Sequence, residues 1–278
     1  MRAPIGLLVC LVTVSAAAEP PTDEALAAHA AALAQRLEGQ GFTILVEPPF
    51  VLVGDEAPAR VRQRAQTVRW TRDLLRRDFF AADPERVLEV WLFKDERSYR
   101  RGAKQYFGDE PDTPYGYYSS SHDAMVMNIG PGAGTLVHEI VHPYLEANFP
   151  GVPAWFNEGL ASLYERPTEV HGHIRGLPNW RLPALQREIR AGSGRTLAKL
   201  VTSTTDDFYG ADDQTYGRAR YLCYYLQEKG LLVDFYRRFL RDRAGDASGL
   251  ATLRAVLGRD DLGAFEKDWD QFVLALRQ

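Results

Sequence analysis

The segment His138–His142, which reads His-Glu-Ile-Val-His, combines residue types that bind metals and move protons. On a helix, residues four apart lie on one face, so the two imidazoles can bind one zinc ion together. Glu139 lies about a quarter-turn around the same helix, where it can serve a water molecule on that ion. The remaining surface of this helix is largely apolar, which is typical of a buried helix lining a cleft.

A third metal ligand is expected from a second helix, predicted for Pro153 to Glu165. Residues Asn148 to Gly151 end the first helix, and a proline is favoured at the first position of the next. Antiparallel packing across a short loop would bring the start of the second helix beside the middle of the first. Glu158 would then complete a His, His, Glu set and leave a fourth position for water, as in catalytic zinc sites. Zinc lowers the pKa of such a water from roughly 16 to about 7.

These segments resemble those of a known family. Residues Trp155–Ala161 read Trp-Phe-Asn-Glu-Gly-Leu-Ala. This is similar to the Trp-Leu-Asn-Glu-Gly-Phe-Ala segment that carries the third zinc ligand in gluzincins of the alanyl-aminopeptidase and leukotriene-hydrolase type. The resemblance implies that His138 and His142 are the other ligands and that Glu139 is the general base. Tyr216 begins a segment similar to the Tyr-x-Lys-Gly helix of those enzymes, which implies that its hydroxyl stabilises the oxyanion. The layout also resembles small secreted peptidase-MA-like proteins.

The strand predicted just before the metal helix is expected to form an edge of the sheet, where an extended peptide can pair with the main chain. Residues Tyr115 to Asn128 are therefore the expected substrate rim, with Met125, Met127 and Asn128 as substrate-binding candidates. The alternative is that the tyrosines and methionines of this stretch alternate into the core. Val126 stands where the aminopeptidases carry the glutamate that binds the substrate amino terminus, so the matched strand lacks that carboxylate.

Composition limits where the protein acts and what it binds. Met1 to Ala18 pair an early arginine with a short apolar run and end in three alanines, which predicts a signal peptide and export to the periplasm or the medium. No later run approaches the roughly 18 apolar residues of a membrane span. Removal of Arg2 changes the net charge from -4 to -5, and the dispersed basic residues predict no nucleic-acid partner. Cys223 remains as the single cysteine after cleavage, which excludes an internal disulfide.

The order of elements predicts an α+β, zincin-like fold. Residues 19–131 are expected to form an N-terminal mixed sheet with helices and an edge hairpin, and 132–278 the active-site helix at the cleft and a C-terminal helical lobe, in one compact unit. Everything after Pro153 is expected to be helix or loop. The predicted helices and strands are Asp23–Glu38, Phe42–Val53 (two strands broken by Pro48-Pro49), Glu56–Phe80, Val87–Phe93, Asp95–Phe107, Tyr115–Ser119, Ala124–Ile129, Asn179–Ala191, Asp212–Lys229, Leu232–Arg241 and Asp261–Leu276.

Several other residues have two interpretations. Tyr216 could instead be a packing aromatic on the face shared with Cys223, and Cys223 is expected in the core. Glu146 could hydrogen-bond a metal ligand. His171 and His173 lie in a polar loop, where they could line the cleft or bind adventitious metal, although a solvated loop is favoured. Arg218 and Arg220 could meet a substrate carboxylate, although most helix arginines are solvated.

The sequence therefore favours an exported metallopeptidase with one zinc per chain and a peptide or protein substrate. Glu139 would take a proton from the attacking water and pass it to the leaving amine, and Tyr216 would donate to the oxyanion. One alternative is a non-catalytic zinc-binding or scaffold protein of the same fold, although an intact Glu139 disfavours it. Another is a hydrolase of amides in cell-wall peptide. The sequence leaves open the substrate, the choice of endo- or exopeptidase, regulation and the oligomeric state.

Overall fold

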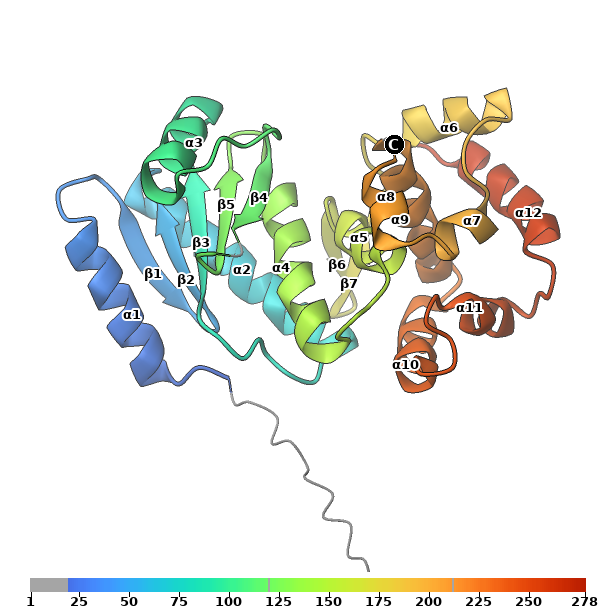
Figure 1. Ribbon diagram of the computed structural model, residues 1–278, viewed down its shortest axis with the longest axis horizontal. Helices are drawn as coiled ribbons and strands as arrows, with labels where there is room; N and C mark the ends of the chain where they lie inside the picture. Colours follow the sequence, from blue (N-terminus) through green and yellow to red (C-terminus); the bar gives the residue numbers. More distant parts are fainter. Residues whose placement is uncertain (1–19, 120, 212) are drawn as a thin grey trace, which may run out of the picture.

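The chain has an α+β organisation, in which a mixed sheet in the first half is followed by helices in the second (Figure 1). The computed structural model describes residues 20–119, 121–211 and 213–278. The predicted α+β class is confirmed. The predicted signal peptide, residues 1–18, lies outside the described residues. Within the described part of the chain, no helix combines the length and the apolar character needed to cross a bilayer.

The sheet has five strands in the order β1-β2-β3-β5-β4. Their bounds are β1 Thr43–Glu47, β2 Phe50–Gly54, β3 Leu88–Phe93, β4 Gly116–Ser119 and β5 Ala124–Asn128. The outer pairs, β1 with β2 and β4 with β5, are antiparallel hairpins, whereas β3 pairs in parallel with both β2 and β5. The central strands are buried along their whole length, as expected for strands covered on both faces.

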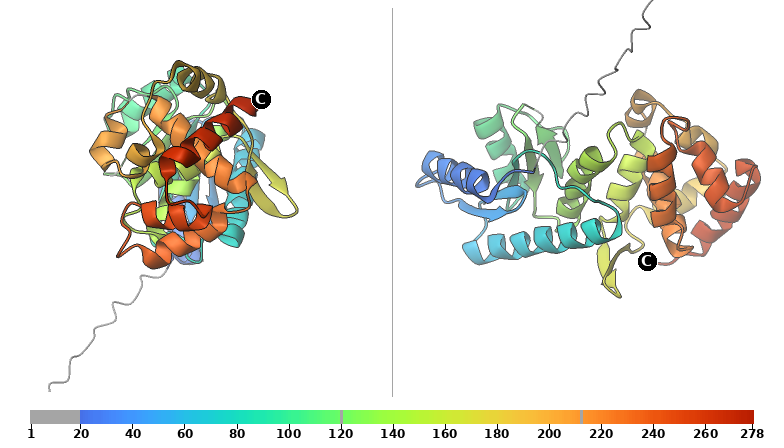
Figure 2. Two further views of the ribbon diagram at one scale, coloured as in Figure 1. Left: turned by 90° about the vertical axis from the view of Figure 1, so that its right-hand side faces the viewer. Right: turned by 90° about the horizontal axis from the view of Figure 1, so that it is seen from below.

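Helices cover both faces of this sheet (Figures 1 and 2). Helices α1 (Asp23–Arg36) and α3 (Glu96–Gly102), which continues into the π-helical stretch η1 (Ala103–Phe107), cover one face, and α2 (Pro58–Asp78) and α4 (Gly134–Asn148) cover the other. Strand β2 shows the alternation, because Val51 and Val53 pack in the α1 layer while Phe50 and Leu52 pack in the layer of α2 and α4. The Asp95 side chain caps α3 by accepting a hydrogen bond from the Ser98 backbone N–H.

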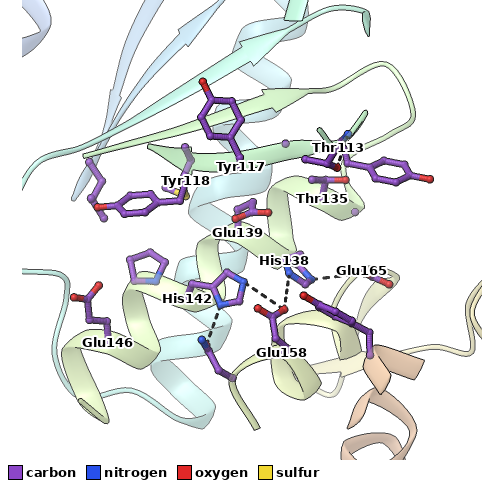
Figure 3. Close-up of a pocket in the computed structure, with 18 of the residues that line it drawn as sticks. Thr113, Tyr117, Tyr118, Thr135, His138, Glu139, His142, Glu146, Glu158 and Glu165 are labelled. Carbon is purple, nitrogen blue, oxygen red and sulfur yellow. Dashed lines mark hydrogen bonds and ion pairs between the residues drawn. The ribbon is translucent and has the colours of Figure 1, made fainter. Parts of the chain in front are cut away.

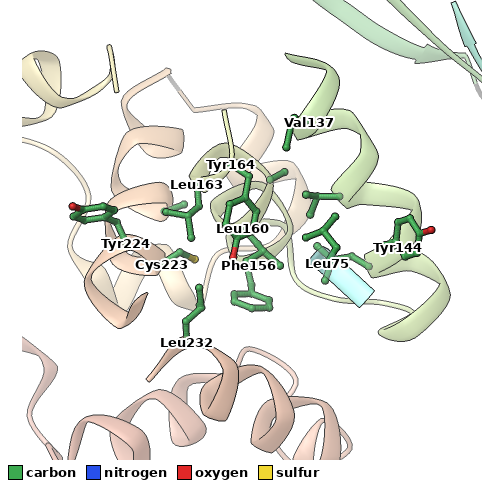
Figure 4. Packing of buried hydrophobic residues seen from close by; sticks show 14 of the residues in the cluster. Leu75, Val137, Tyr144, Phe156, Leu160, Leu163, Tyr164, Cys223, Tyr224 and Leu232 are labelled. Atoms are coloured by element: carbon green, nitrogen blue, oxygen red, sulfur yellow. The ribbon is translucent and has the colours of Figure 1, made fainter. Parts of the chain in front are cut away.

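The second half is mainly helical. Its helices are α5 Ala154–Leu163, α6 Leu182–Ala191, α7 Leu197–Val201, α8 Thr205–Tyr209, α9 Asp213–Glu228, α10 Leu232–Asp242, α11 Leu250–Leu257 and α12 Leu262–Ala275. The apolar core is continuous between the halves, since Val137 and Tyr144 of α4 belong to the same cluster as Phe156 of α5 and Cys223 of α9 (Figure 4). Cys223 is fully buried, which confirms its predicted place in the core. Three short helices, α7, α8 and α11, were not predicted, because five to eight residues carry little periodicity.

The prediction that only helix and loop follow Pro153 was wrong, because β6 (Pro167–Val170) and β7 (His173–Gly176) form an antiparallel hairpin. Its two turn residues, His171 and Gly172, both have positive φ, as a two-residue type I′ turn requires. The usual sequence signal for this turn is Asn-Gly or Asp-Gly, and histidine replaces it here. His173 binds Asp78 of α2 at 2.6 Å. Neither His171 nor His173 lines the cleft that contains the predicted metal ligands His138, His142 and Glu158.

The prediction that the strand before the metal helix is a sheet edge was also wrong. Strand β5 lies between β3 and β4, so the edge is β4. The sequence shows that Tyr115 to Ile129 forms a hairpin, but only the parallel pairing of β3 with β5 decides which of its two strands faces outward.

Helices α5 and α9 approach each other closely at Gly159. A Cβ atom at this position would lie 2.9 Å from the Ala219 carbonyl oxygen and 2.9 Å from Cys223 Sγ. A side chain there would push α5 away from α9, and α5 carries the predicted third metal ligand. Glycine at this position therefore fixes how deeply α5 sits in the helical lobe.

We predict that Gly159→Ala destabilises the protein by about 1–3 kcal/mol, because overpacking against a backbone carbonyl outweighs the better helix propensity of alanine. Urea unfolding followed by circular dichroism measures the change. Gly217→Ala is the control, since a Cβ at Gly217 in α9 would meet only Leu185 Cβ, at 3.9 Å. Equal stability of the two variants would contradict the packing argument.

Candidate metal centre

Two helices bring the predicted metal ligands together (Figure 3). Helix α4 buries Val137, Ile140 and Val141 against the core, which turns His138 and His142 toward the cleft on its other side. At the end of α4, the Asn148 side chain binds the backbone of Ala81 and Ala82 and so anchors the helix. The chain then turns back into α5, as predicted from the short loop.

The three side chains form one compact group. His138 Nε2 lies 3.4 Å and His142 Nε2 lies 3.9 Å from Glu158 Oε2, and the candidate ligand atoms of all three lie within 4.8 Å of one another. All three side chains are mostly shielded from solvent, and Glu158 is the most buried. The predicted grouping of His138, His142 and Glu158 is therefore present in the structure.

This donor set could hold a metal ion, and its spacing is compatible with that of a zinc site. Bonds of roughly 2.0–2.2 Å in a tetrahedral site separate neighbouring donor atoms by about 3.3–3.6 Å. The 3.4 Å separation of His138 Nε2 from Glu158 Oε2 falls in that range, and the 3.9 Å separation from His142 Nε2 needs only a small side-chain movement. Two imidazoles and one carboxylate leave a fourth position, which faces the cleft that all three residues line.

Two of the three side chains have a hydrogen-bond partner that orients them, and the third lies near a carboxylate. The Oδ1 atom of Asn157 accepts a hydrogen bond of 2.9 Å from His142 Nδ1, which leaves Nε2 with its lone pair facing Glu158. The hydroxyl of Tyr209, from α8, donates a 2.8 Å hydrogen bond to Glu158 Oε1 and leaves Oε2 for the histidine side. His138 Nδ1 is buried without a hydrogen bond, and Glu165 Oε1 lies 3.7 Å from it.

Glu165 is itself held in place. The Arg181 guanidinium binds its two carboxylate oxygens at 2.8 and 3.0 Å, and the Asn179 amide donates to it at 2.6 Å. Arg181 also lies over the rings of Trp180 and Tyr216, at 4.2 and 5.5 Å from their centroids. A bidentate arginine pair of this kind fixes the carboxylate next to His138.

Charge complementarity holds the ligand group together. Burial favours the neutral form of His138, but the hydrogen bond to Glu158 and the nearby carboxylates of Glu139 and Glu165 outweigh burial and raise its pKa. Burial also favours neutral Glu158, but His138 and His142 outweigh it and lower the pKa of this carboxyl. The acidic surroundings thus stabilise positive charge between these side chains, and a metal ion would compete with the His138 proton for that place.

The other predicted catalytic residues line the same cleft. Its volume is about 1610 Å³, and Glu139 and Tyr216 both contribute to its wall. Glu139 is not part of the ligand group but lies one residue from His138 on the cleft side of α4 (Figure 3). The Tyr216 ring lies 5.1 Å from the Phe208 ring and 6.5 Å from the Tyr209 ring. Tyr216 therefore packs against aromatic neighbours and also lines the cleft.

Of the predicted substrate-binding residues, only Met125 reaches the cleft. Met127 is fully buried in the core. Asn128 is also buried, and its amide group donates to the Pro114 carbonyl and accepts from the Gly130 backbone. The structure therefore corrects the prediction for Met127 and Asn128. Because β5 is an inner strand, Met127 packs in the core and Asn128 binds the backbone of Pro114 and Gly130.

For three other residues the structure does not bear out the interpretations that the sequence left open. Glu146 contacts no metal ligand; its carboxylate is largely exposed and lies 3.7 Å from Arg86. Arg218 and Arg220 are not solvated but buried. Arg218 pairs with Glu188 and Glu266, and Arg220 donates to the Leu163 and Leu177 carbonyls, so neither arginine faces the cleft.

The sequence does not predict Tyr209, Glu165, Arg181 or Trp180 as site residues. Tyr209 and Glu158 are 51 positions apart, and only the packing of α8 against α5 brings them together. Asn157 could have been identified as a site residue from the sequence, because it directly precedes the predicted ligand Glu158 in the Asn-Glu-Gly segment. No model of a known protein family matches the chain, and a search of curated proteins finds no match.

We predict about one zinc ion per chain, with most of it lost in Glu158→Ala and in His142→Ala, because two donors hold the ion much more weakly than three. Elemental analysis after dialysis against zinc-free buffer measures the content, with Glu169→Ala on β6 as a control. Full zinc content in both ligand variants would remove this set of ligands from the account.

We predict that Tyr209→Phe lowers zinc affinity by about 10- to 100-fold, because outer-shell hydrogen bonds orient first-shell ligands. Competition with a fluorescent chelator gives the dissociation constant. The ring and its packing remain in this variant, so its thermal stability without metal should change little. An unchanged zinc affinity would show that the 2.8 Å hydrogen bond to Glu158 has no orienting role.

Proposed function

We propose that this protein is an exported single-zinc metallopeptidase. The observation that carries the proposal is the meeting of His138, His142 and Glu158 in one cleft that Glu139 also lines. A His, His, Glu donor set with an open fourth position suits a catalytic rather than a structural zinc ion. When bound, the ion would activate a water molecule and polarise a carbonyl group.

The side chains around the ion would divide the proton transfers between them. Glu139 accepts a proton from the attacking water and delivers it to the nitrogen of the leaving amine. The Tyr216 hydroxyl donates a hydrogen bond to the carbonyl oxygen as negative charge develops on it. Asn157, Tyr209 and Glu165 keep the ligands in place during these steps, because each lies against a different ligand.

The arrangement of the lobes is compatible with a zincin-like layout of the gluzincin type. The sheet lobe ends in α4, the cleft lies on one side of this helix, and the helical lobe supplies Glu158 (Figure 1). The edge strand β4 lines the same cleft and offers main-chain groups for pairing with an extended peptide. These features support the resemblance of the Trp155–Ala161 segment to gluzincins.

We predict that Glu139→Gln abolishes peptide hydrolysis but retains the fold and the bound zinc, because the side chain serves the water and is not a ligand. Mass spectrometry of a peptide library digest and elemental analysis of the same sample give the two readouts. If the zinc-loaded parent protein cleaves no library peptide, the non-catalytic scaffold is the better interpretation.

We predict that Tyr216→Phe lowers kcat by about a hundred- to thousandfold, the cost of one lost oxyanion donor, while zinc content and KM change little. Steady-state kinetics at full zinc loading measures this effect. Tyr209→Phe provides the contrast, because its loss of activity should be recovered by added zinc. A Tyr216→Phe enzyme with parental kcat would assign this residue to packing alone.

A further inference from the structure

The cleft continues past the metal ligands in both directions along α4. This helix has 15 residues, so it is roughly 22 Å long, and His138 and His142 lie in its middle. Residues from both ends of the helix line the cleft, Thr135 at the first turn and Ala147 at the last. A bound chain can therefore extend to either side of the ligand group.

Beside the C-terminal half of α4, the lining of the cleft includes five apolar or aromatic side chains, here called the apolar subsite: Leu88, Tyr118, Met125, Pro143 and Ala147. Tyr118 and Met125 are direct cross-strand partners in β4 and β5, so they share one face of the sheet. Leu88 and Met125 are almost fully buried and form the floor, while Tyr118 is 41 % exposed and forms a wall. Figure 3 shows Tyr118 on the strand side of the cleft, on the same side of His142 as Glu146.

Charged side chains that pair with one another form the rim of this apolar subsite. Arg86 Nε lies 3.2 Å from Asp123, and Arg86 Nη2 lies 3.7 Å from Glu146. Tyr118 donates a 2.8 Å hydrogen bond to the same Asp123. Arg86 is thus paired with two carboxylates and does not present an unpaired charge to the carboxylate of a chain end.

The opposite end of the cleft has the same character. Arg181 is bound by both oxygens of Glu165, and Trp180, 59 % exposed, covers its guanidinium. The two arginines of the cleft are therefore both paired with acidic groups. The exposed aromatic side chains Tyr115, Tyr118, Trp180 and Tyr209 all line this cleft, and exposed aromatic side chains gathered in one cleft indicate a binding site.

We propose that the cleft binds the interior of an extended peptide and that the apolar subsite selects one large apolar side chain, leucine or phenylalanine, on that peptide. This rests on the proposed peptidase function and makes the enzyme an endopeptidase. The main chain of the peptide pairs with edge strand β4 across the ligand group. The cleft extends past the ligand group on both sides, and both of its arginines are paired, so it offers no unpaired cation for the carboxylate of a chain end.

The test is calorimetric binding of end-blocked peptides to the zinc-loaded Glu139→Gln protein, which keeps the complex intact. The peptides are acetylated, amidated glycine and serine decamers in which Leu, Phe, Ala or Asp is placed at each position in turn. At one position, Leu and Phe should bind about ten- to hundredfold more tightly than Ala, as expected for burial of one large apolar side chain. Asp should not bind more tightly than Ala.

Two variants change the apolar subsite in opposite ways. Ala147→Phe fills it from α4, and Tyr118→Ala removes its wall, so each should reduce the preference for Leu and Phe to less than threefold. Ala32→Phe, at an exposed position of α1, adds the same ring far from the cleft and should keep the parental preference.

Equal binding of Ala, Leu and Phe peptides would overturn the proposal, as would an unchanged preference in both subsite variants. Tighter binding only after removal of the acetyl or amide group would overturn the endopeptidase assignment. Failure of the proposed function looks different: the parental protein would show the predicted peptide preference, with zinc bound, but would cleave none of the peptides that bind.

Discussion

The site depends on one buried carboxylate. Glu158 is 6 % exposed and lies within 4 Å of two imidazoles, and burial of a carboxylate is costly unless charge or hydrogen bonds compensate it. Here the compensation comes from His138 and His142 on one side and from the Tyr209 hydroxyl on the other. A divalent cation would complete it, because two neutral imidazoles and one carboxylate form a site with a net charge of about +1 when zinc is bound.

The rest of the fold keeps Glu158 at that place. Helix α4 packs on the sheet through its apolar face, and α5 is held between α4 and α9 by the close approach at Gly159. The aromatic cluster beneath α5, in which Phe156 contacts Phe235 and Tyr236, adds a large apolar contact to the same helix. Ligand geometry and lobe packing are therefore linked, since a shift of α5 moves Glu158 relative to the histidines.

The sequence predicts those parts of the site that local periodicity controls. His138 and His142 follow from four-residue spacing, and Glu158 follows from a short loop between two helices. Tyr209 and Glu165 do not, because their positions depend on how α8 and the segment after α5 pack in three dimensions. The fold, too, is only partly predictable from the sequence. The α+β order was predictable. The edge position of β4 was not, because it depends on the long-range β3–β5 pairing, and neither was the β6–β7 hairpin, because its turn uses an unusual histidine.

The central claim is that one zinc ion binds between His138, His142 and Glu158. Diffraction from crystals grown with zinc, recorded on both sides of the zinc absorption edge, tests it most directly. The account predicts one strong anomalous peak per chain, about 2.0–2.2 Å from both Nε2 atoms and a Glu158 oxygen, on the cleft side of α4. A fully soaked crystal without a peak there, or with its strongest peak on other residues, would contradict the account.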